Sequence, residues 1–208
     1  MYSFKNIIQD EHELVNVIGE PHPVARDKAI DRLDEFCKTF ISRSPFVVVA
    51  TCDENGNLDT SPKGDPAGFV QVLDDHTLVM PERPGNKRAD SYKNILRNPK
   101  ATLIFFIPGK NETLRVAGHA RIIKDADILD EMKVNGKAPK LGLALHVEEA
   151  FFHCAKCMVR SKLWQSEFWP GLDGLPTLAQ TMIANTSKSI SLDDLEQGVQ
   201  YDVENKLY

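Results

Sequence analysis

Hydrophobic and polar positions along this chain follow two different periods. Between Ala25 and Ile41, apolar residues recur at spacings of three and four with charges between them, which is typical of a helix that buries one face. Prolines flank this stretch, at Pro21 and Pro23 before it and at Pro45 after it, and they favour its ends there. The pattern therefore predicts an amphipathic helix over 25–41 that packs on the body of the protein.

From Pro45 to about Val147, the chain consists of short apolar runs separated by turn residues, which indicates strands. Asn55-Gly56 is a strong hairpin signal, because these residues readily adopt positive φ. We expect one short helix that stops at Asn98-Pro99 and another that begins after Asp125 as N-cap. The predicted strands are 46–52, 58–63, 69–73, 77–80, 101–107, 113–123 and 141–147.

Six or seven short strands with few helices predict a mainly β fold, either an antiparallel barrel or a sandwich, with flanking helices. The strands do not alternate with long helices, which argues against a dinucleotide-binding parallel sheet. Beyond residue 166 the chain carries turn residues, followed by helical patterns around 175–184 and 192–205.

Composition narrows the class of protein. The chain has 208 residues, of which 42% are hydrophobic and 26% charged, as in an ordinary globular protein. Its net charge of -5 argues against nucleic-acid binding, which needs a basic face. No apolar stretch approaches the roughly 20 residues of a membrane span, and the first residues do not resemble a signal peptide. We expect a cytoplasmic protein that binds neither nucleic acid nor membrane.

The four cysteines fit that compartment. Cys37 and Cys52 lie in apolar patterns and are expected in the core. Cys154 and Cys157 form a C-x-x-C spacing, but zinc would need a second ligand pair at matching spacing, and a thioredoxin-like pair would follow the first strand of a βαβ unit. A structural role is favoured for this pair, and a redox or metal role remains the alternative.

The segment from Pro81 to Arg88 is the most informative for function. It follows an apolar strand and opens a predicted helix, and it contains Gly85, Lys87 and Arg88. Backbone N–H groups at the helix start would point at an anion, and the two cations would add full charges. The segment is therefore a candidate phosphate site, with a solvated basic loop as the alternative.

Five short segments, in order along the chain, carry a family resemblance. They are 44–51 with Asn55-Gly56, 61–65, 83–99, 114–120 and 149–156. On these segments, residues 40–164 resemble the FMN-binding split-barrel proteins of the pyridoxamine 5′-phosphate oxidase-like superfamily, and in particular a subgroup of FMN-dependent enzymes. The resemblance implies a six-stranded antiparallel Greek-key split barrel and a homodimer with FMN at the subunit interface.

This resemblance also implies a domain division. An N-terminal helical extension at 1–43 would pack on an FMN-binding split barrel at 44–165, and a C-terminal helical extension would occupy 166–208.

The resemblance assigns roles to residues of the first subunit. Asn86, Lys87 and Arg88 match the place where the family holds the FMN phosphate, with Arg83 in the same loop. Ser61 and Lys63 lie on the strand that approaches the flavin ring and ribityl chain. A cation near the N1–C2=O edge would stabilise the anionic reduced flavin, which gives Lys63 a physical reason to be there. The alternative for Lys63 is a surface lysine on a strand.

Further candidates lie on later segments. Asn94 would reach the phosphate or cap the loop, and Arg115 would pair with an anion of the cofactor or substrate, unless it is simply solvated. The segment 151–164 would come from the second subunit. Its polar and aromatic residues suited to a flavin cleft are Lys156, Arg160, Ser161, Lys162 and Trp164.

The leading hypothesis is an FMN-dependent oxidoreductase that transfers hydride at flavin N5 on a small-molecule substrate. Pyridoxamine phosphate oxidases recognise their substrate phosphate through a cationic C-terminal segment, and residues 166–174 contain no such cluster, which argues against the vitamin B6 reaction. Alternatives are a non-enzymatic FMN carrier or redox sensor, a deazaflavin protein, and a haem-binding split barrel. His119, His146 and His153 are the haem-ligand candidates, and His153 is also the best candidate for an acid or base.

Overall fold

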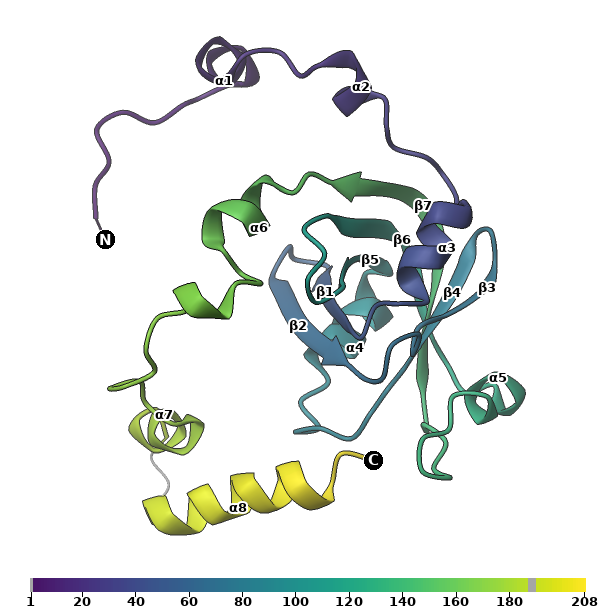
Figure 1. Ribbon diagram of the computed structural model, residues 1–208, viewed down its shortest axis with the longest axis vertical. Coiled ribbons are helices and arrows are strands. Elements are labelled where there is room, and N and C mark those ends of the chain that lie inside the picture. Colours follow the sequence, from purple (N-terminus) through teal and green to yellow (C-terminus); the bar gives the residue numbers. More distant parts are fainter. Residues whose placement is uncertain (1, 187–189) are drawn as a thin grey trace.

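The computed structural model describes residues 2–186 and 190–208, and its centre is one curved antiparallel sheet (Figure 1). The strands are β1 (Phe46–Cys52), β2 (Leu58–Gly64), β3 (Gln71–Asp74), β4 (Thr77–Pro81), β5 (Lys100–Phe106), β6 (Thr113–Ile123) and β7 (Gly142–His153). The helices are α1 (Glu11–Ile18), α2 (Pro23–Arg26), α3 (Glu35–Ile41), α4 (Asp90–Arg97), α5 (Ala126–Asp130), α6 (Lys156–Ser161), α7 (Leu178–Ala184) and α8 (Leu192–Asn205), with a 3-10 turn at Ser166–Phe168. The predicted mainly β class with flanking helices is confirmed.

The sheet has seven strands in the order β2-β1-β5-β6-β7-β4-β3, so the expected count of six is wrong. Strand β3 is a short edge strand that, within the described residues, pairs only with β4. Within the described residues β2 pairs only with β1, so the two edge strands do not join and the sheet forms no closed barrel.

Alternating side chains on β1 and β5 build the core between the strands and α3. Val47 and Val49 of β1 lie opposite Phe105 and Leu103 of β5, and all four are fully buried. Burying each such side chain contributes about 1.5–3 kcal/mol relative to leaving it exposed. This register therefore fixes which face of β1 points inward.

The longest strand pair, β6 with β7, contains a bulge. The register shifts between Ala117 and Gly118, opposite the segment that follows His146. A Cβ atom added to Gly118 would lie 1.9 Å from the His146 carbonyl oxygen. Only glycine fits this close approach of two backbones.

The predicted helix over 25–41 is wrong for residues 27–34. The structure has the short α2 and then α3, and between them Ile30 forms a β-bridge with Ala150 through two backbone hydrogen bonds. Asp34 then starts α3, because its side chain accepts a hydrogen bond from the Cys37 N–H at 2.8 Å. The backbone pairing at Ile30 and the cap at Asp34 together prevent one continuous helix.

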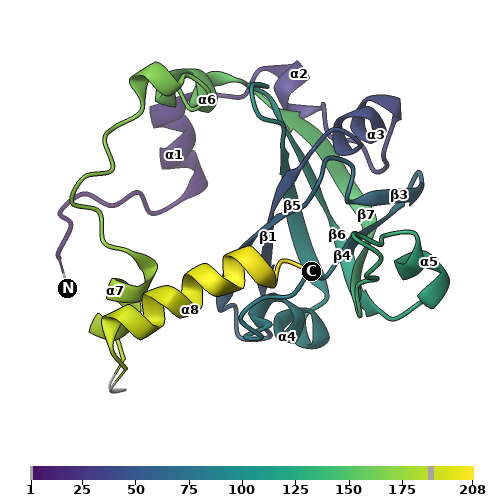
Figure 2. The same cartoon turned by 60° about the horizontal axis from the view of Figure 1, so that its bottom comes forward.

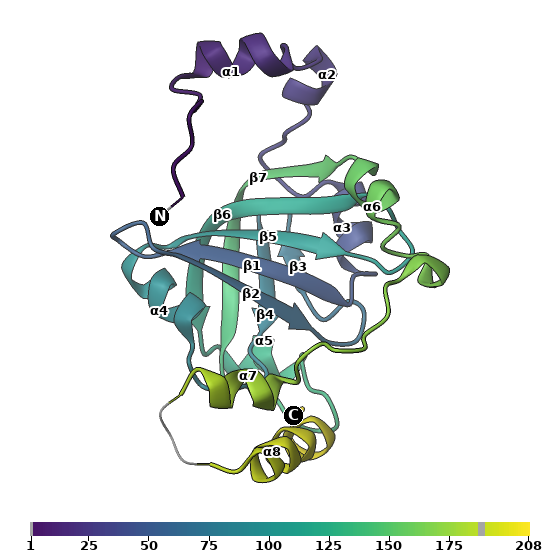
Figure 3. The same cartoon turned by 90° about the vertical axis from the view of Figure 1, so that its left-hand side faces the viewer.

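The terminal segments extend away from the sheet at opposite ends (Figure 3). Helices α1 and α2 bury no residue, and the N-terminal region contributes to the core through Leu33 and α3. At the other end α7 packs on α8, and α8 returns toward the body, so that Tyr208 reaches the sheet region (Figure 2). No helix in the described part of the chain combines the length and apolar character needed to cross a membrane.

Candidate functional site

A cavity of about 1170 Å³ opens between β2, the segment that follows β4, and the loop before β7. Its walls come from residues 59–64 and 81–92, from residues 137–141, and from Phe69 and Tyr208. The candidate residues Ser61, Lys63, Arg83, Asn86, Lys87 and Arg88 all line it. The structure therefore brings two segments singled out in the sequence to one site: strand β2 and the segment 81–88, which is called the basic loop below.

The lining of this cavity is positively charged although the protein is acidic. Six cations line it against three carboxylates, a net charge of +3, whereas the whole chain carries -5. The cations are Lys63, Arg83, Lys87, Arg88, Lys137 and Lys140, and the carboxylates are Asp59, Glu82 and Asp90. A concave wall with an excess of cations concentrates anions.

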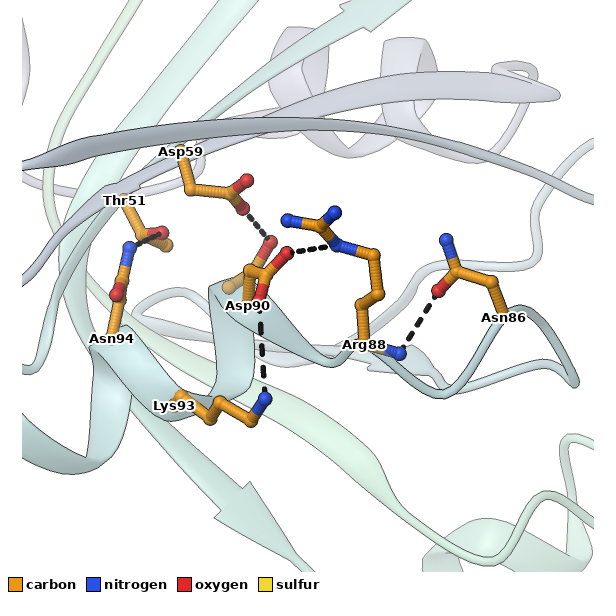
Figure 4. Close-up of polar contacts among 8 residues, drawn as sticks. Thr51, Asp59, Asn86, Arg88, Asp90, Lys93 and Asn94 are labelled. Carbon is orange, nitrogen blue, oxygen red and sulfur yellow. Dashed lines mark hydrogen bonds and ion pairs between the residues drawn. The ribbon is translucent and has the colours of Figure 1, made fainter. Parts of the chain in front are cut away.

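The basic loop is held in an unusual backbone conformation. Lys87 and Ala89 have φ angles of 60° and 54°, in the left-handed region that non-glycine residues seldom adopt. The Asn86 side chain accepts a hydrogen bond from the Arg88 N–H at 3.0 Å, and Arg88 donates from Nε to Asp90 at 2.7 Å (Figure 4). Ala89 provides no side-chain cap for α4, which leaves the first N–H groups of the helix available.

Helix α4 is fixed to the sheet by two polar contacts on its inner face. Ser91 donates to Asp59 of β2, and Asn94 donates from Nδ2 to Thr51 Oγ1 of β1 at 3.1 Å (Figure 4). The Asn94 amide is thus engaged with the sheet and does not line the cavity. These contacts position the basic loop relative to β2.

Lys63, Glu82 and Tyr92 meet in the middle of the cavity wall. Lys63 Nζ lies 3.5 Å from Glu82 Oε2 and 5.9 Å from the centre of the Tyr92 ring. The Tyr92 hydroxyl is buried and makes no hydrogen bond with the described residues. Burial, and next the nearby Glu82 carboxylate, raises the pKa of Tyr92, so its hydroxyl keeps its proton and remains a hydrogen-bond donor close to Glu82.

Arg83 lies at the end of the cavity nearest Asp65. It donates from Nε to Asp65 at 2.6 Å and from Nη2 to the Met132 carbonyl at 2.8 Å. The Asp65 side chain is only 1% exposed, so this pair is buried. The other Asp65 oxygen accepts a hydrogen bond from the Tyr208 hydroxyl at 2.6 Å.

Besides Asn94, the candidate Arg115 and the candidates at 156–164 lie outside this cavity in the single chain. Arg115 pairs with Glu149 at 3.2 Å on the outer face of the sheet, and its guanidinium lies 5.1 Å from the Phe151 ring centre. The others are on or just after α6: Lys156, Ser161, which donates to the Met158 carbonyl, and Trp164, which donates from Nε1 to the Lys110 carbonyl.

The histidines and cysteines considered from the sequence are also outside the cavity lining. His119 contacts Glu148, His146 lies beside His76, and His153 packs edge-on against Phe151. Cys154 and Cys157 are both exposed thiols, and the described residues contain no cluster of three or more ligands suited to a metal ion.

Several lining residues were missed from the sequence. Tyr92 was treated only as part of a helical pattern, and Lys137, Lys140 and Tyr208 come from segments far from the basic loop. The local signal was the three lysines in residues 133–140, a composition typical of any exposed loop.

Comparison with known proteins gives the family. A family model described as pyridoxamine 5′-phosphate oxidase matches residues 33–154, more than half of the chain. The chain therefore belongs to the pyridoxamine 5′-phosphate oxidase family, as the five sequence segments indicated. No curated protein matches the chain.

Solved structures to which the chain is similar include HupZ from Group A Streptococcus, at 24% identity over 57% of this chain and 92% of that one, with a TM-score of 0.46. An FMN-binding protein from Syntrophomonas wolfei is 13% identical over 56% of this chain and 83% of that one, with a TM-score of 0.44. A pyridoxamine 5′-phosphate oxidase-related, FMN-binding protein from Nostoc punctiforme is 16% identical over 52% and 73% of the two chains, with a TM-score of 0.39.

Proposed function

We propose that this protein binds FMN in the positively charged cavity and acts as an FMN-dependent oxidoreductase on a small-molecule substrate. The observation that carries the proposal is the net charge of +3 on the lining of a cavity in an acidic chain. Four of the six cations lie on the loop and strand that the family resemblance associates with FMN.

Two features of the cavity fit FMN in particular. Lys87 makes no ion pair with the described residues, and it lies in the left-handed loop beside the uncapped start of α4, which suits a phosphate. The orphan Tyr92 hydroxyl suits a ligand that also carries neutral hydrogen-bond acceptors, as the flavin ring and ribityl chain do. A simple phosphate would satisfy the first feature alone.

The residues of this chain would divide the work of binding. Asn86, Lys87 and Arg88 would hold the phosphate. Asp90 would fix the orientation of the Arg88 guanidinium, and the Asn86 side chain would fix that of the Arg88 backbone N–H. Ser61 would lie along the ligand on β2. Bound FMN would supply the redox chemistry, by accepting or giving hydride at N5.

Lys63 would stabilise the reduced form of the cofactor. Its side chain is three-quarters buried and its ammonium nitrogen lies 3.5 Å from Glu82, so it is held in place by a carboxylate in a partly desolvated wall. A fixed cation beside the N1–C2=O edge stabilises negative charge on the reduced flavin. The Glu82 carboxylate would limit this effect by sharing the charge of Lys63.

The second part of the proposal is a homodimer in which each FMN site uses both chains. In one chain Lys156, Ser161 and Trp164 lie outside the cavity, and a second chain would bring its copies to the open side. The outer sheet face carries partly exposed apolar residues, such as Phe46, Val48 and Ile104, beside Arg115. Such a face is suited to a symmetric interface. The boundaries proposed for the three regions remain 1–43, 44–165 and 166–208.

The absorbance spectrum of the purified protein, followed by an FMN titration, tests this function. We expect a flavin spectrum or saturable FMN binding, with bleaching of the flavin band when a nicotinamide cofactor or a small reductant is added without oxygen. A Soret band would instead support the haem alternative. Absence of FMN binding at micromolar concentration would contradict the proposal.

Sedimentation tests the dimer separately. A monomer that holds a full complement of FMN would show that one chain is enough and would overturn the shared site.

A further inference from the structure

Tyr208 is the one residue of the 190–208 segment that lines the cavity. Its hydroxyl donates to Asp65 at 2.6 Å, its ring faces the Arg83 guanidinium at 5.4 Å, and its main-chain oxygen accepts a hydrogen bond from Lys137 Nζ at 2.9 Å. The three partners come from three different segments. Asp65 and Arg83 hold the ring and Lys137 holds the main chain, so Tyr208 bridges two walls of the cavity.

The contacts made at the two ends of β2 show where Tyr208 lies along the cavity. Asp59, at one end of the strand, bonds to Ser91 at the start of α4, beside the basic loop. Asp65 follows the other end of the strand and bonds to Tyr208. The two aspartates are six residue steps apart along extended chain, which corresponds to about 20 Å. Tyr208 therefore lies at the end of the cavity away from Asn86, Lys87 and Arg88.

The segment that carries Tyr208 is weakly attached elsewhere. Helix α8 buries no residue, and residues 202–207 are all exposed. The hydrogen bonds and ring contact of Tyr208 thus provide much of what holds this end of α8 at the cavity. A segment with few buried contacts opens at low cost in free energy.

Resting on the proposed FMN site, we propose that Tyr208 is a gate at the flavin-ring end of the cavity, which limits access of substrates to the bound cofactor. A phosphate held at Arg88 directs the rest of FMN along β2 toward Asp65, so the end that Tyr208 closes is the end where the ring would react. Tyr208 acts as a positioning residue: it fastens α8 to Asp65, Arg83 and Lys137. The nearby Asp65 carboxylate raises the pKa of the phenol, which keeps the donor protonated.

Two variants separate this role from a general effect on the helix. Tyr208→Phe removes the hydroxyl that bonds Asp65 but keeps the ring, and the buried Asp65 retains its pair with Arg83. Tyr201→Phe makes the same chemical change on α8, at a side chain that is 54% exposed and outside the cavity lining. It is the matched control.

The first measurement needs no flavin: hydrogen exchange of the apo protein over residues 199–207. We expect exchange to be about tenfold faster in Tyr208→Phe, the factor for losing one hydrogen bond to a charged group, and unchanged in Tyr201→Phe. Equal exchange in the wild type and Tyr208→Phe would overturn the gate, because the hydroxyl would not fasten the segment.

The second measurement uses the FMN-loaded protein and quenching of flavin fluorescence by iodide. The gate predicts a quenching constant at least twice that of the wild type in Tyr208→Phe, with the FMN dissociation constant unchanged, because the phosphate end is distant. Unchanged quenching in a variant with faster exchange would overturn the gate while leaving the FMN site intact. Failure of the wild type to bind FMN would refute the proposed function, and the gate with it.

Discussion

Arg88 donates from Nε to Asp90 Oδ2 at 2.7 Å, which ties the basic loop to the first turn of α4. The two terminal nitrogens of this guanidinium make no hydrogen bond with the described residues. Lys93 approaches the other Asp90 oxygen at 3.9 Å, but Lys93 does not line the cavity. Asp90 therefore lies between two cations, of which only Arg88 is placed to meet a ligand (Figure 4).

This geometry provides a matched pair for testing the phosphate site. Arg88→Ala should weaken FMN binding about ten- to a hundredfold, or about 1.5–3 kcal/mol, because it removes a charge-assisted contact. Lys93→Ala removes the other cation beside Asp90 and should leave the affinity unchanged. Titrations of both variants with FMN and with riboflavin make the comparison. Equal losses for the two ligands in Arg88→Ala would mean that Arg88 does not bind the phosphate.

Tyr92→Phe should have opposite effects on folding and on binding. The variant removes a buried hydroxyl that has no partner among the described residues, so the free energy of unfolding of the apo protein should be unchanged or higher. If FMN accepts the hydrogen bond from Tyr92, its affinity should fall about three- to tenfold, the effect of one neutral hydrogen bond.

Urea denaturation and an FMN titration of the same Tyr92→Phe preparation measure the two effects, with Tyr201→Phe as the control for a general tyrosine effect. Destabilisation of the apo protein together with unchanged FMN affinity would show that the hydroxyl serves the fold and not the ligand.

Local patterns were enough to predict most of the sheet. The run at Phe46–Cys52 and the long strand at Thr113–Ile123 have the predicted bounds, because alternation and turn residues mark both ends. Strand β7 continues to His153, beyond the predicted end at Val147. Glu148 and Glu149 break the apolar pattern there, but the strand goes on because it pairs with β6. The extent of β7 is thus set by its partner strand.

The helix prediction over 25–41 failed for a related reason. Ile30 and Leu33 fit a helical period, but Ile30 pairs with Ala150, a residue 120 positions away that no local pattern can reveal. The cavity shows the same limit. Lys63 and Lys87 could be proposed because each stands in a recognisable segment. Tyr208 acquires its place through contacts with Asp65, Arg83 and Lys137, which are far from it in the sequence.

Gly118→Ala should destabilise the protein strongly without touching the cavity. The new Cβ atom would lie 1.9 Å from the His146 carbonyl oxygen, and the bulge between β6 and β7 would have to open. We expect a loss of about 3 kcal/mol or more in the free energy of unfolding, the upper range for overpacking. Gly85→Ala is the control, since a Cβ atom there meets no atom within 4 Å. Similar denaturation midpoints for the two variants would contradict the assigned register.

The pH dependence of the free energy of unfolding should show the effect of protonating His153. Burial, together with the positive charges of Lys28 and Arg115, lowers the pKa of this imidazole below its ordinary value. The unfolded chain therefore binds the proton more readily than the folded chain does. The stability contributed by neutral His153 is fully present above the unfolded pKa of about 6.5, and it is lost as the pH falls through the lower folded pKa.

Replacing His153 by Gln should consequently flatten the decline in stability below about pH 6.5, where the unfolded histidine takes up its proton. Urea denaturation midpoints of the apo protein at a series of pH values from neutral downward measure this slope. His22→Gln, at an exposed position on the N-terminal segment, should leave the slope as it is in the wild type. An unchanged slope in His153→Gln would assign the acid sensitivity to other groups. It would mean that burial and the charges of Lys28 and Arg115 do not hold His153 in its neutral form.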